Sequence, residues 1–307
     1  MSETANFGKA WTGADKPYAA SYGKLMMWFF LITDALTFSA FLAAYGFSRF
    51  KYEESWPVPE DVFTHFPFLH GNHPLLFVAL MTFILIMSSV TMVLAVNYGH
   101  KMKKNKVVLW LTLTIVGGIT FLGSQAWEWS HFIHGDKGAV VLEKTVDFYP
   151  NPIAHVIKDG HIYSIDKVMH HDSDLEAGHD QEINFQEFKE RFSEQKSLSL
   201  RLPNRKILEN QLAVEYLNEY GSGIVRGANL ENNEYGHPLF GDYFFFITGF
   251  HGFHVFSGVI ILIIILINVL KNTYEKRGHY EMVEKVGLYW HFVDLVWVFV
   301  FTFFYLV

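Results

Sequence analysis

Residues 248–266 read Thr248-Gly-Phe-His251-Gly-Phe-His254-Val-Phe-Ser-Gly258-Val-Ile-Ile-Leu-Ile-Ile-Ile-Leu266. They belong to a longer run, Tyr243–Leu270, that contains no Asp, Glu, Lys or Arg. About 20 such residues in a helix cross the hydrocarbon core of a bilayer. A helix that is apolar on every face is buried in lipid or in a large core. The run therefore predicts a membrane-spanning helix, and this one carries two histidines.

Four further runs of similar length predict four more spans. The sequence is half apolar and 18% charged, whereas soluble domains carry about 25% charged residues. The four runs are Leu25–Phe47, Pro74–Asn97, Val107–Trp129 and Val286–Val307. The expected fold class is an all-α integral membrane bundle of five transmembrane helices, with a small mixed α/β extramembrane insertion domain between helices three and four. The expected segments are an N-terminal tail (1–23), helices one to three (24–132), the insertion domain (133–239) and helices four and five (240–307).

Charge is concentrated in the predicted insertion domain. Between His131 and Phe240 there are 18 acidic and 11 basic residues, while the rest of the chain has 13 of each. The net charge of −7 argues against a nucleic-acid binder, which would present a basic surface. The absence of cysteine excludes disulfides, thiolate metal sites and a cysteine nucleophile.

The short basic segments predict an orientation. Lysine and arginine accumulate on the cytoplasmic side of membrane proteins. They gather here in the N-terminal tail and in the second and fourth connections, at Lys9, Lys16, Lys24, Lys101, Lys103, Lys104, Lys106, Lys271, Lys276, Arg277 and Lys285. We therefore expect a cytoplasmic N-terminus, with the insertion domain and the C-terminus on the outside.

Local patterns predict structure inside the insertion domain. Ile153–Ile157 and His161–Ile165 flank Asp159-Gly160, which favours a type I′ hairpin. Two apolar helical faces are expected, followed by Gly221 at a helix C-terminus. The faces are Phe185, Phe188 and Phe192, and Leu208, Leu212 and Tyr216.

Residues 182–188 resemble the second half of an EF-hand loop, and within the whole stretch 176–188 Asp180 and Glu187 would be the calcium ligands. The first half lacks the required aspartates and glycine, so an acidic helix start is the favoured interpretation. The nearby polar cluster is interpreted as a solvated loop rather than a metal site. It consists of His170, His171, Asp172, Asp174 and His179.

Several ionisable residues fall inside the predicted spans, where a charge costs about 2.5–3.5 kcal/mol on insertion scales. They are Asp34, Glu128, His131, His251, His254, His291 and Asp294. Six of them form pairs three residues apart, and each such pair shares a helix face. Asp34 and His254 fall at similar depth, so we expect a hydrogen bond between them that holds spans one and four together.

Three interpretations of these residues remain open. A metal site in the bundle is weakly supported, because Glu-x-x-His occurs once, at Glu128–His131, while di-iron bundles use it twice. A proton or substrate path through Asp34 and His254 is the second. The third is structural, in which polar pairs hold helices together, lipid head groups or a partner subunit. Physical reasoning alone favours the third.

Four stretches resemble subunit III of the haem–copper cytochrome oxidases. Residues 248–258 resemble the family's Thr-Gly-x-His-Gly-x-His-Val signature. The last span, Tyr289-Trp290-His291-Phe-Val-Asp294-Leu-Val-Trp297, is similar to another signature. The other two stretches are Phe121-Leu-Gly-Ser-Gln125-Ala-Trp-Glu128 and the helix from Trp28 to Tyr45 that carries Asp34. Three features depart from the commonest family pattern. The chain resembles the five-helix form, whereas many members have seven helices; Asp34 replaces the commoner Glu; and the insertion domain has no counterpart.

The resemblance implies a supporting subunit that is not itself catalytic. It would carry no haem, copper or other metal, pack on subunit I, have subunit II as a further partner, and bind structural phospholipids. Asp34 and His254 would line the lipid cleft, and Glu128, His251, Trp290, His291 and Asp294 would make helix contacts. The complex would sit in a bacterial inner membrane, reduce dioxygen to water and pump protons, with cytochrome c as the expected donor.

Two alternatives are kept for the function, and three for the insertion domain. The chain could serve a quinol oxidase, or be an intramembrane metalloenzyme that uses Glu128, His131, His251 and His254. The insertion domain could dock a further subunit of the complex, attract a basic electron donor such as cytochrome c, or be merely a solvated acidic domain.

Overall fold

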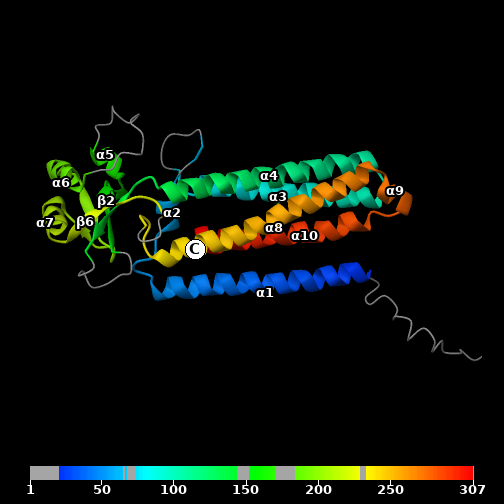
Figure 1. Ribbon diagram of the computed structural model, residues 1–307, viewed down its shortest axis with the longest axis horizontal. Helices are drawn as coiled ribbons and strands as arrows, with labels where there is room; N and C mark the ends of the chain where they lie inside the picture. The colour runs from blue at the N-terminus through cyan, green and yellow to red at the C-terminus, as the bar shows by residue number, and fades with distance from the viewer. Residues whose placement is uncertain are drawn as a thin grey trace, which may run out of the picture. The chain divides into compact units, whose positions relative to one another are not determined.

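The computed structural model describes residues 21–64, 66–67, 73–143, 152–169, 184–228 and 233–306. In this part of the chain five helices are long and apolar enough to cross a membrane (Figure 1). They are α1 (Tyr22–Lys51), α3 (Leu76–His100), α4 (Lys104–His134), α8 (Pro238–Leu270) and α10 (Glu281–Val300), which continues as the π-helix η3 (Phe301–Leu306). The predicted fold class is confirmed: a helical membrane protein with a strand-containing insertion between its third and fourth spans.

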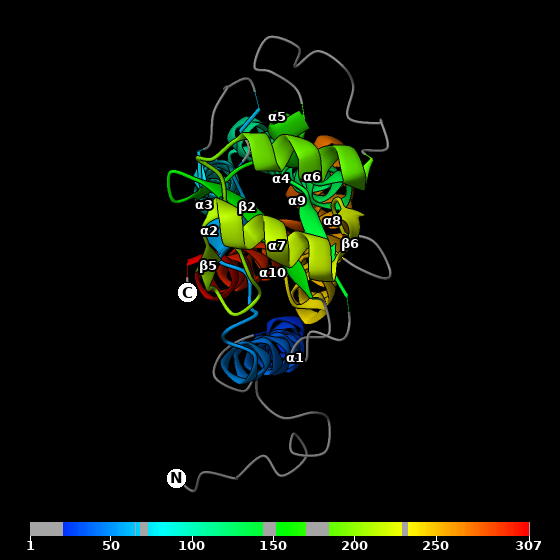
Figure 2. The ribbon, with the colours of Figure 1, turned by 90° about the vertical axis from the view of Figure 1, so that its left-hand side faces the viewer.

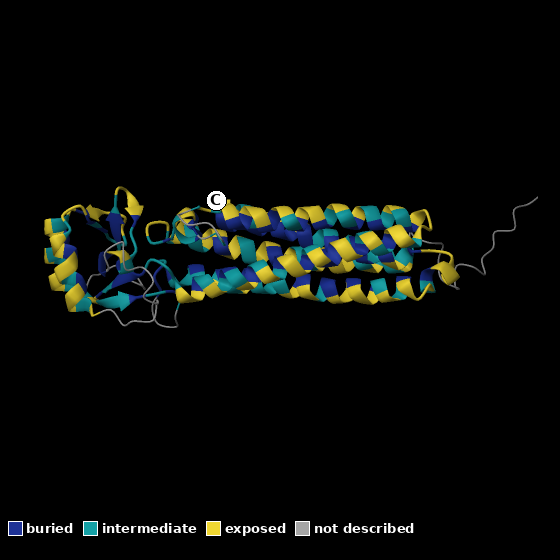
Figure 3. Ribbon diagram, turned by 90° about the horizontal axis from the view of Figure 1, so that it is seen from above, coloured by how far each residue is buried: buried dark blue, intermediate teal, exposed yellow. Residues whose placement is uncertain are grey.

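Short polar connections join the spans. Met102, with φ of 53°, turns the chain between α3 and α4. Between α8 and α10 lies the short helix α9 (Thr273–Arg277), which ends at Gly278 with φ of 76°. Glycine adopts this left-handed conformation without steric cost. The helices mix buried and exposed residues along their length (Figure 3), but in α1 only 11% of the most apolar window is buried in the chain alone.

The chain divides into two compact units, each described by itself below. The first contains residues 1–41, 83–120 and 253–299, and the second contains residues 42–82, 121–252 and 300–307. Parts of several long helices therefore contribute to each unit. The insertion domain lies wholly in the second.

Trp290 is the centre of packing in the first unit and is fully buried. A Cβ added at Gly118 would lie 2.6 Å from its ring, and one at Gly258 would lie 3.0 Å from it. Larger residues at these two positions would collide with the indole. Its Nε1 donates a hydrogen bond to Oγ of Ser88 at 3.0 Å. At Gly252, in the second unit, nothing lies within 4 Å of an added Cβ.

The insertion domain contains an antiparallel sheet in the order β5-β4-β2-β1-β6, with β3 paired to β2. The strands are β1 (Ala139–Leu142), β2 (Ile153–Lys158), β3 (His161–Ile162), β4 (Ser199–Arg201), β5 (Ile207–Leu208) and β6 (Gly221–Val225). The predicted hairpin is confirmed, because β2 pairs with β3 and the turn residues Asp159 and Gly160 have φ of 52° and 82°. Its second strand is shorter than predicted, since Ile165 begins a helix.

Three helices pack on this sheet: α5 (Ile165–Met169), α6 (Phe185–Glu194) and α7 (Asn210–Tyr220). Helices α6 and α7 lie side by side (Figure 2). The predicted apolar face of α6 is confirmed, with Phe188 and Phe192 fully buried. The second predicted face is wrong. Leu208 lies in β5, Leu212 is 57% exposed, and α7 instead buries Ala213 and Leu217.

Gly221 does follow α7, as predicted, but its φ of −74° is available to any residue. Lack of room for a side chain explains the glycine instead. A Cβ here would lie 2.5 Å from the ring of Phe185 and 2.5 Å from the carbonyl oxygen of Leu217.

Candidate intramembrane polar sites and the outer junction

Asp34 of α1 and His254 of α8 meet in the first unit, as their similar depth predicted. Nε2 of His254 lies 3.0 Å from Oδ2 of Asp34, and the two side chains are only 9% and 16% exposed. The ring of Phe38 packs edge-on against the imidazole, with 5.4 Å between centroids. A carboxylate and an imidazole at this distance offset each other's desolvation and connect two helices.

A second polar contact of the first unit joins α10 to α3. Nδ1 of His291 lies 2.6 Å from Oγ of Ser89, beside the contact between Trp290 and Ser88. Asp294, three residues further along α10, is 6% exposed. Adjacent serines on α3 thus bind adjacent residues of the last span. These hydrogen bonds are the kind of polar contact that connects helices in a membrane.

Glu128 of α4 is held by side chains of the second unit. Its Oε2 accepts hydrogen bonds from Nε2 of Gln125 at 3.0 Å and from the hydroxyl of Tyr305 at 3.1 Å. Gln125 precedes it by three residues on the same helix face. Tyr305 comes from η3 and was not singled out in the sequence, because its approach depends on helix packing.

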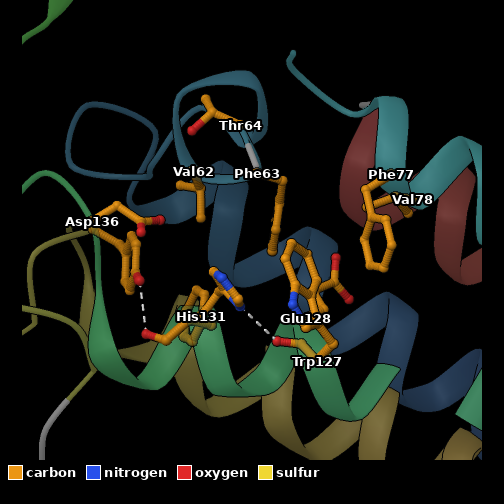
Figure 4. A pocket seen from close by; sticks show the side chains of 11 residues that line it. Val62, Phe63, Thr64, Phe77, Val78, Trp127, Glu128, His131 and Asp136 are labelled. Atoms are coloured by element: carbon orange, nitrogen blue, oxygen red, sulfur yellow. Dashed lines mark hydrogen bonds between the residues drawn. The ribbon is translucent and has the colours of Figure 1, made fainter. Parts of the chain in front are cut away.

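His131, which shares a helix face with Glu128, makes a local contact. Its Nδ1 lies 3.0 Å from the carbonyl oxygen of Trp127, and the two rings are 3.8 Å apart. Glu128 and His131 both line a cavity of about 30 Å³, together with Thr64 and Asp136 (Figure 4). This volume suits about one water molecule.

His251 is 1% exposed and packs edge-on against Phe121, with 5.8 Å between ring centroids. It therefore packs against a different ring from His254, three residues away. Among the described residues, no three His, Cys, Asp or Glu side chains are grouped to hold a metal ion. This includes the set Glu128, His131, His251 and His254. Of the calcium-loop residues, Glu187 lies in α6 and accepts from Arg191 at 3.4 Å; Asp180 and the histidine cluster lie outside the described residues.

Glu234 is the residue that sequence reasoning missed. It is 4% exposed and follows the described end of β6 by nine residues. Four main-chain N–H groups donate to its carboxylate: Asp136 and Lys137 to Oε1 at 3.1 and 3.3 Å, and Gly138 and Gly227 to Oε2 at 3.1 and 2.8 Å. The side chain thereby joins the segment after α4 to the segment that leads to α8. Burial raises the pKa of Glu234, and the main-chain donors of Gly227, Asp136 and Lys137 oppose that shift.

Other polar groups surround this junction. Nε2 of His155 lies 2.6 Å from the carbonyl oxygen of Glu234, and burial lowers the pKa of His155 to about 4. Lys137 donates from Nζ to the carbonyl oxygen of Asp61 at 2.7 Å. Nη1 of Arg201 lies 3.1 Å from Oδ2 of the same Asp61. The first connection between spans is thus tied to the insertion domain.

The arrangement can hold helices and connections in place, and it presents intramembrane polar groups in contact with one another. A family model described as cytochrome c oxidase subunit III matches residues 233–307. This segment includes α8 and α10 and so holds His251, His254, Trp290, His291 and Asp294.

Curated relatives match over 63–67 residues of the chain. A cytochrome c oxidase subunit 3 from Rhipicephalus sanguineus is 46% identical over 67 residues, which are 22% of this chain and 26% of the relative. The proteins of that name from Spodoptera frugiperda and Chondrus crispus are each 44% identical, over 20% and 21% of this chain and 42% and 23% of their own lengths. The chain thus covers less than half the length of these relatives. Residues 233–307 are therefore similar to cytochrome c oxidase subunit III.

Proposed function

We propose that the chain is the non-redox subunit III of a haem–copper terminal oxidase that reduces dioxygen to water and pumps protons. Subunits I and II are its partners; they hold the haem and copper, and cytochrome c is the donor. The observation that carries this proposal is the contact between Asp34 and His254 at 3.0 Å. In this contact an intramembrane carboxylate lies against a histidine of the family-matched segment, which supports a helix-holding role.

We extend the proposal to lipid and subunit contacts. Helix α1 exposes large apolar side chains over most of its length, and these must meet lipid or protein in a membrane. They include Phe29, Phe30, Phe47 and Phe50, which are 48–84% exposed in the chain alone. Phospholipid and subunit I are the proposed occupants, with Asp34 and His254 at the edge of the lipid site. Glu128, His251, Trp290, His291 and Asp294 are the proposed helix contacts.

The proposed location is a bacterial cytoplasmic membrane with the N-terminus in the cytoplasm. Basic side chains in the connections support this orientation through the positive-inside rule. Lys101 and Lys103 lie between α3 and α4, and Lys276 and Arg277 lie in α9, between α8 and α10. The insertion domain and the C-terminus would then face the periplasm.

Purification of the tagged chain from its native membrane in mild detergent tests the function. We expect co-purification of two larger subunits, haem and copper absorbance, and oxygen consumption with reduced cytochrome c. The chain expressed alone should be colourless. Stoichiometric iron or copper on the isolated chain would overturn the proposal, and activity with quinol but not with cytochrome c would overturn the donor.

The insertion domain is proposed to dock a further subunit of the complex. Its sheet and helices enclose a core of their own, and helices α6 and α7 turn charged faces outward, with Glu190 and Glu215 exposed. Deletion of residues 135–235 should remove one co-purifying protein while leaving the subunit I contact. A change in salt-dependent activity alone would favour attraction of a basic donor, and no change in either readout would leave a solvated domain.

A further inference from the structure

A cavity of about 260 Å³ lies in the second unit, where the first connection between spans meets the insertion domain. Trp56 and Pro57 of that connection form one wall. Arg201 of β4 and Arg205 of the turn that follows form another. The volume approaches the range of about 300–1,000 Å³ that is typical of small-molecule sites. It is far larger than the water-sized cavity beside Glu128.

The lining of this cavity is basic, although the segment that builds most of it is acidic. Arg201 and Arg205 are opposed by one acidic lining residue, Glu54. His155 also lines the cavity and adds no charge near neutral pH, because burial lowers its pKa to about 4. Asp61, outside the lining, pairs with Arg201, so the cavity offers an anion guanidinium N–H donors rather than a net positive charge. The contact of Arg201 with Asp61 uses only Nη1, and a guanidinium has five N–H donors.

Arg205 occupies a backbone conformation that disfavours its own side chain. Its φ is 61°, in the left-handed region that glycine and asparagine adopt at lower cost. Nη2 donates to the carbonyl oxygens of Glu53 at 3.0 Å and Trp56 at 3.4 Å. These contacts hold the guanidinium at the wall of the cavity. A strained arginine at a position suited to glycine indicates that its side chain is needed there.

The remaining walls are apolar and partly aromatic. Besides Trp56 and Pro57, they include Leu202, Pro203 and Tyr235. Such walls suit the organic part of a ligand whose charged end meets the arginines. Inorganic ions alone would leave these surfaces without a contact.

We propose that this cavity binds a phosphate ester, with the phosphate between Arg201 and Arg205 and the organic part against Trp56. Guanidinium groups match phosphate oxygens in bidentate geometry. Either a soluble phosphate ester or a phospholipid head group supplies this chemistry. The proposal stands on the insertion domain and the first connection, so it does not depend on the chain being an oxidase subunit.

Calorimetric titration of the full chain in detergent tests it, with glycerol 3-phosphate, dihexanoyl phosphatidic acid and uncharged glycerol as probes. Binding of glycerol 3-phosphate identifies a soluble source, and binding of the phosphatidic acid alone identifies a lipid. Arg205→Asn tolerates the positive φ and removes the guanidinium. It should weaken binding of the active probe about 10- to 100-fold.

Two further variants separate a built site from a general charge effect. Lys206→Gln removes the same charge from the next residue of the turn and should bind within about twofold of the native chain. Val58→Phe adds a ring at the cavity wall, keeps both arginines and should abolish binding. The proposal is overturned if neither phosphate probe binds, if Arg205→Asn and Lys206→Gln weaken binding equally, or if Val58→Phe binds as the native chain does.

Discussion

Glu234 and Glu128 are both buried carboxylates of the second unit, but different kinds of donor hold them. Four main-chain N–H groups surround Glu234, from Asp136, Lys137, Gly138 and Gly227. Two side chains, those of Gln125 and Tyr305, donate hydrogen bonds to Glu128. Main-chain donors remain in place whatever side chain occupies position 234. Loss of the carboxylate therefore leaves all four N–H groups without their acceptor. The side-chain donors of Glu128 can turn toward other acceptors.

Removal of the Glu234 carboxylate should therefore have the largest effect. Glu234→Ala leaves four N–H groups without their acceptor, and we expect a loss of about 3–5 kcal/mol in the free energy of unfolding. Thermal unfolding in detergent measures it, and hydrogen exchange at Gly138 and Gly227 localises it. Glu215→Ala, on the exposed face of α7, is the control. Equal losses in the two variants would contradict the anchoring role.

Acid should destabilise the Glu234 junction through His155. The folded-state pKa of about 4 lies below the ordinary value of 6.5, so between these values the unfolded chain binds more protons than the folded one. Stability contributed by neutral His155 is present above pH 6.5 and is lost as the pH falls toward 4. The full loss is about 3 kcal/mol.

Unfolding measured from pH 7 to pH 4 in the native chain and in His155→Gln checks this prediction. The raised pKa of Glu234 acts in the opposite direction, because its contribution is lost as the pH rises. The difference between the two proteins isolates His155. If the two profiles run parallel, titration of His155 does not control the junction.

Asp34 and His254 extend the comparison to a carboxylate held by one side chain. We expect a coupling energy of about 0.6–1.7 kcal/mol between them, the range found for polar contacts between membrane helices. A double-mutant cycle with Asp34→Asn and His254→Phe measures it, using unfolding of the chain in mixed detergent. Additive effects of the two substitutions would show that the 3.0 Å contact contributes nothing.

Tyr305→Phe should have the smallest effect. It removes one of two donors to Oε2 of Glu128 and leaves Gln125 in place. We expect a loss of about 0.5–1.5 kcal/mol in unfolding free energy. Tyr305 is 1% exposed, so phenylalanine keeps its packing. A loss as large as that of Glu234→Ala would remove the distinction between the two kinds of donor.

The same distinction explains what could be predicted from the sequence. The contact between Asp34 and His254 can be predicted from the sequence, because a polar residue in a membrane span needs a partner. Counting along the helix gives the depth of each residue in the span. Gln125 and Glu128 lie three residues apart on one helix. Glu234 could not be predicted in this way, because a main-chain N–H group donates from any residue type except proline. The sequence therefore does not show which residues are its donors. Its partners lie up to 98 residues away in the chain.

Short elements were the other source of error. The face Leu208, Leu212 and Tyr216 has helical spacing, but Leu208 pairs with Leu200 in the sheet. Sheet pairing therefore outweighed the local pattern at the start of α7. The positive φ of Arg205 likewise could not be predicted from the sequence. It follows from the turn between β4 and β5 and not from the residue type.

The close approach of the main chain at Gly135 and Gly227 bears on how such a protein changes during evolution. The amide of Ala228 donates to the carbonyl oxygen of Ile133 at 3.2 Å, and a Cβ at Gly227 would lie 1.9 Å from that oxygen. The segment between them thus begins and ends at nearly one point. Segments with adjacent ends can be gained or lost without moving the structure that carries them. In this respect residues 136–226 form an insertion that joins the helical part of the chain at a single place.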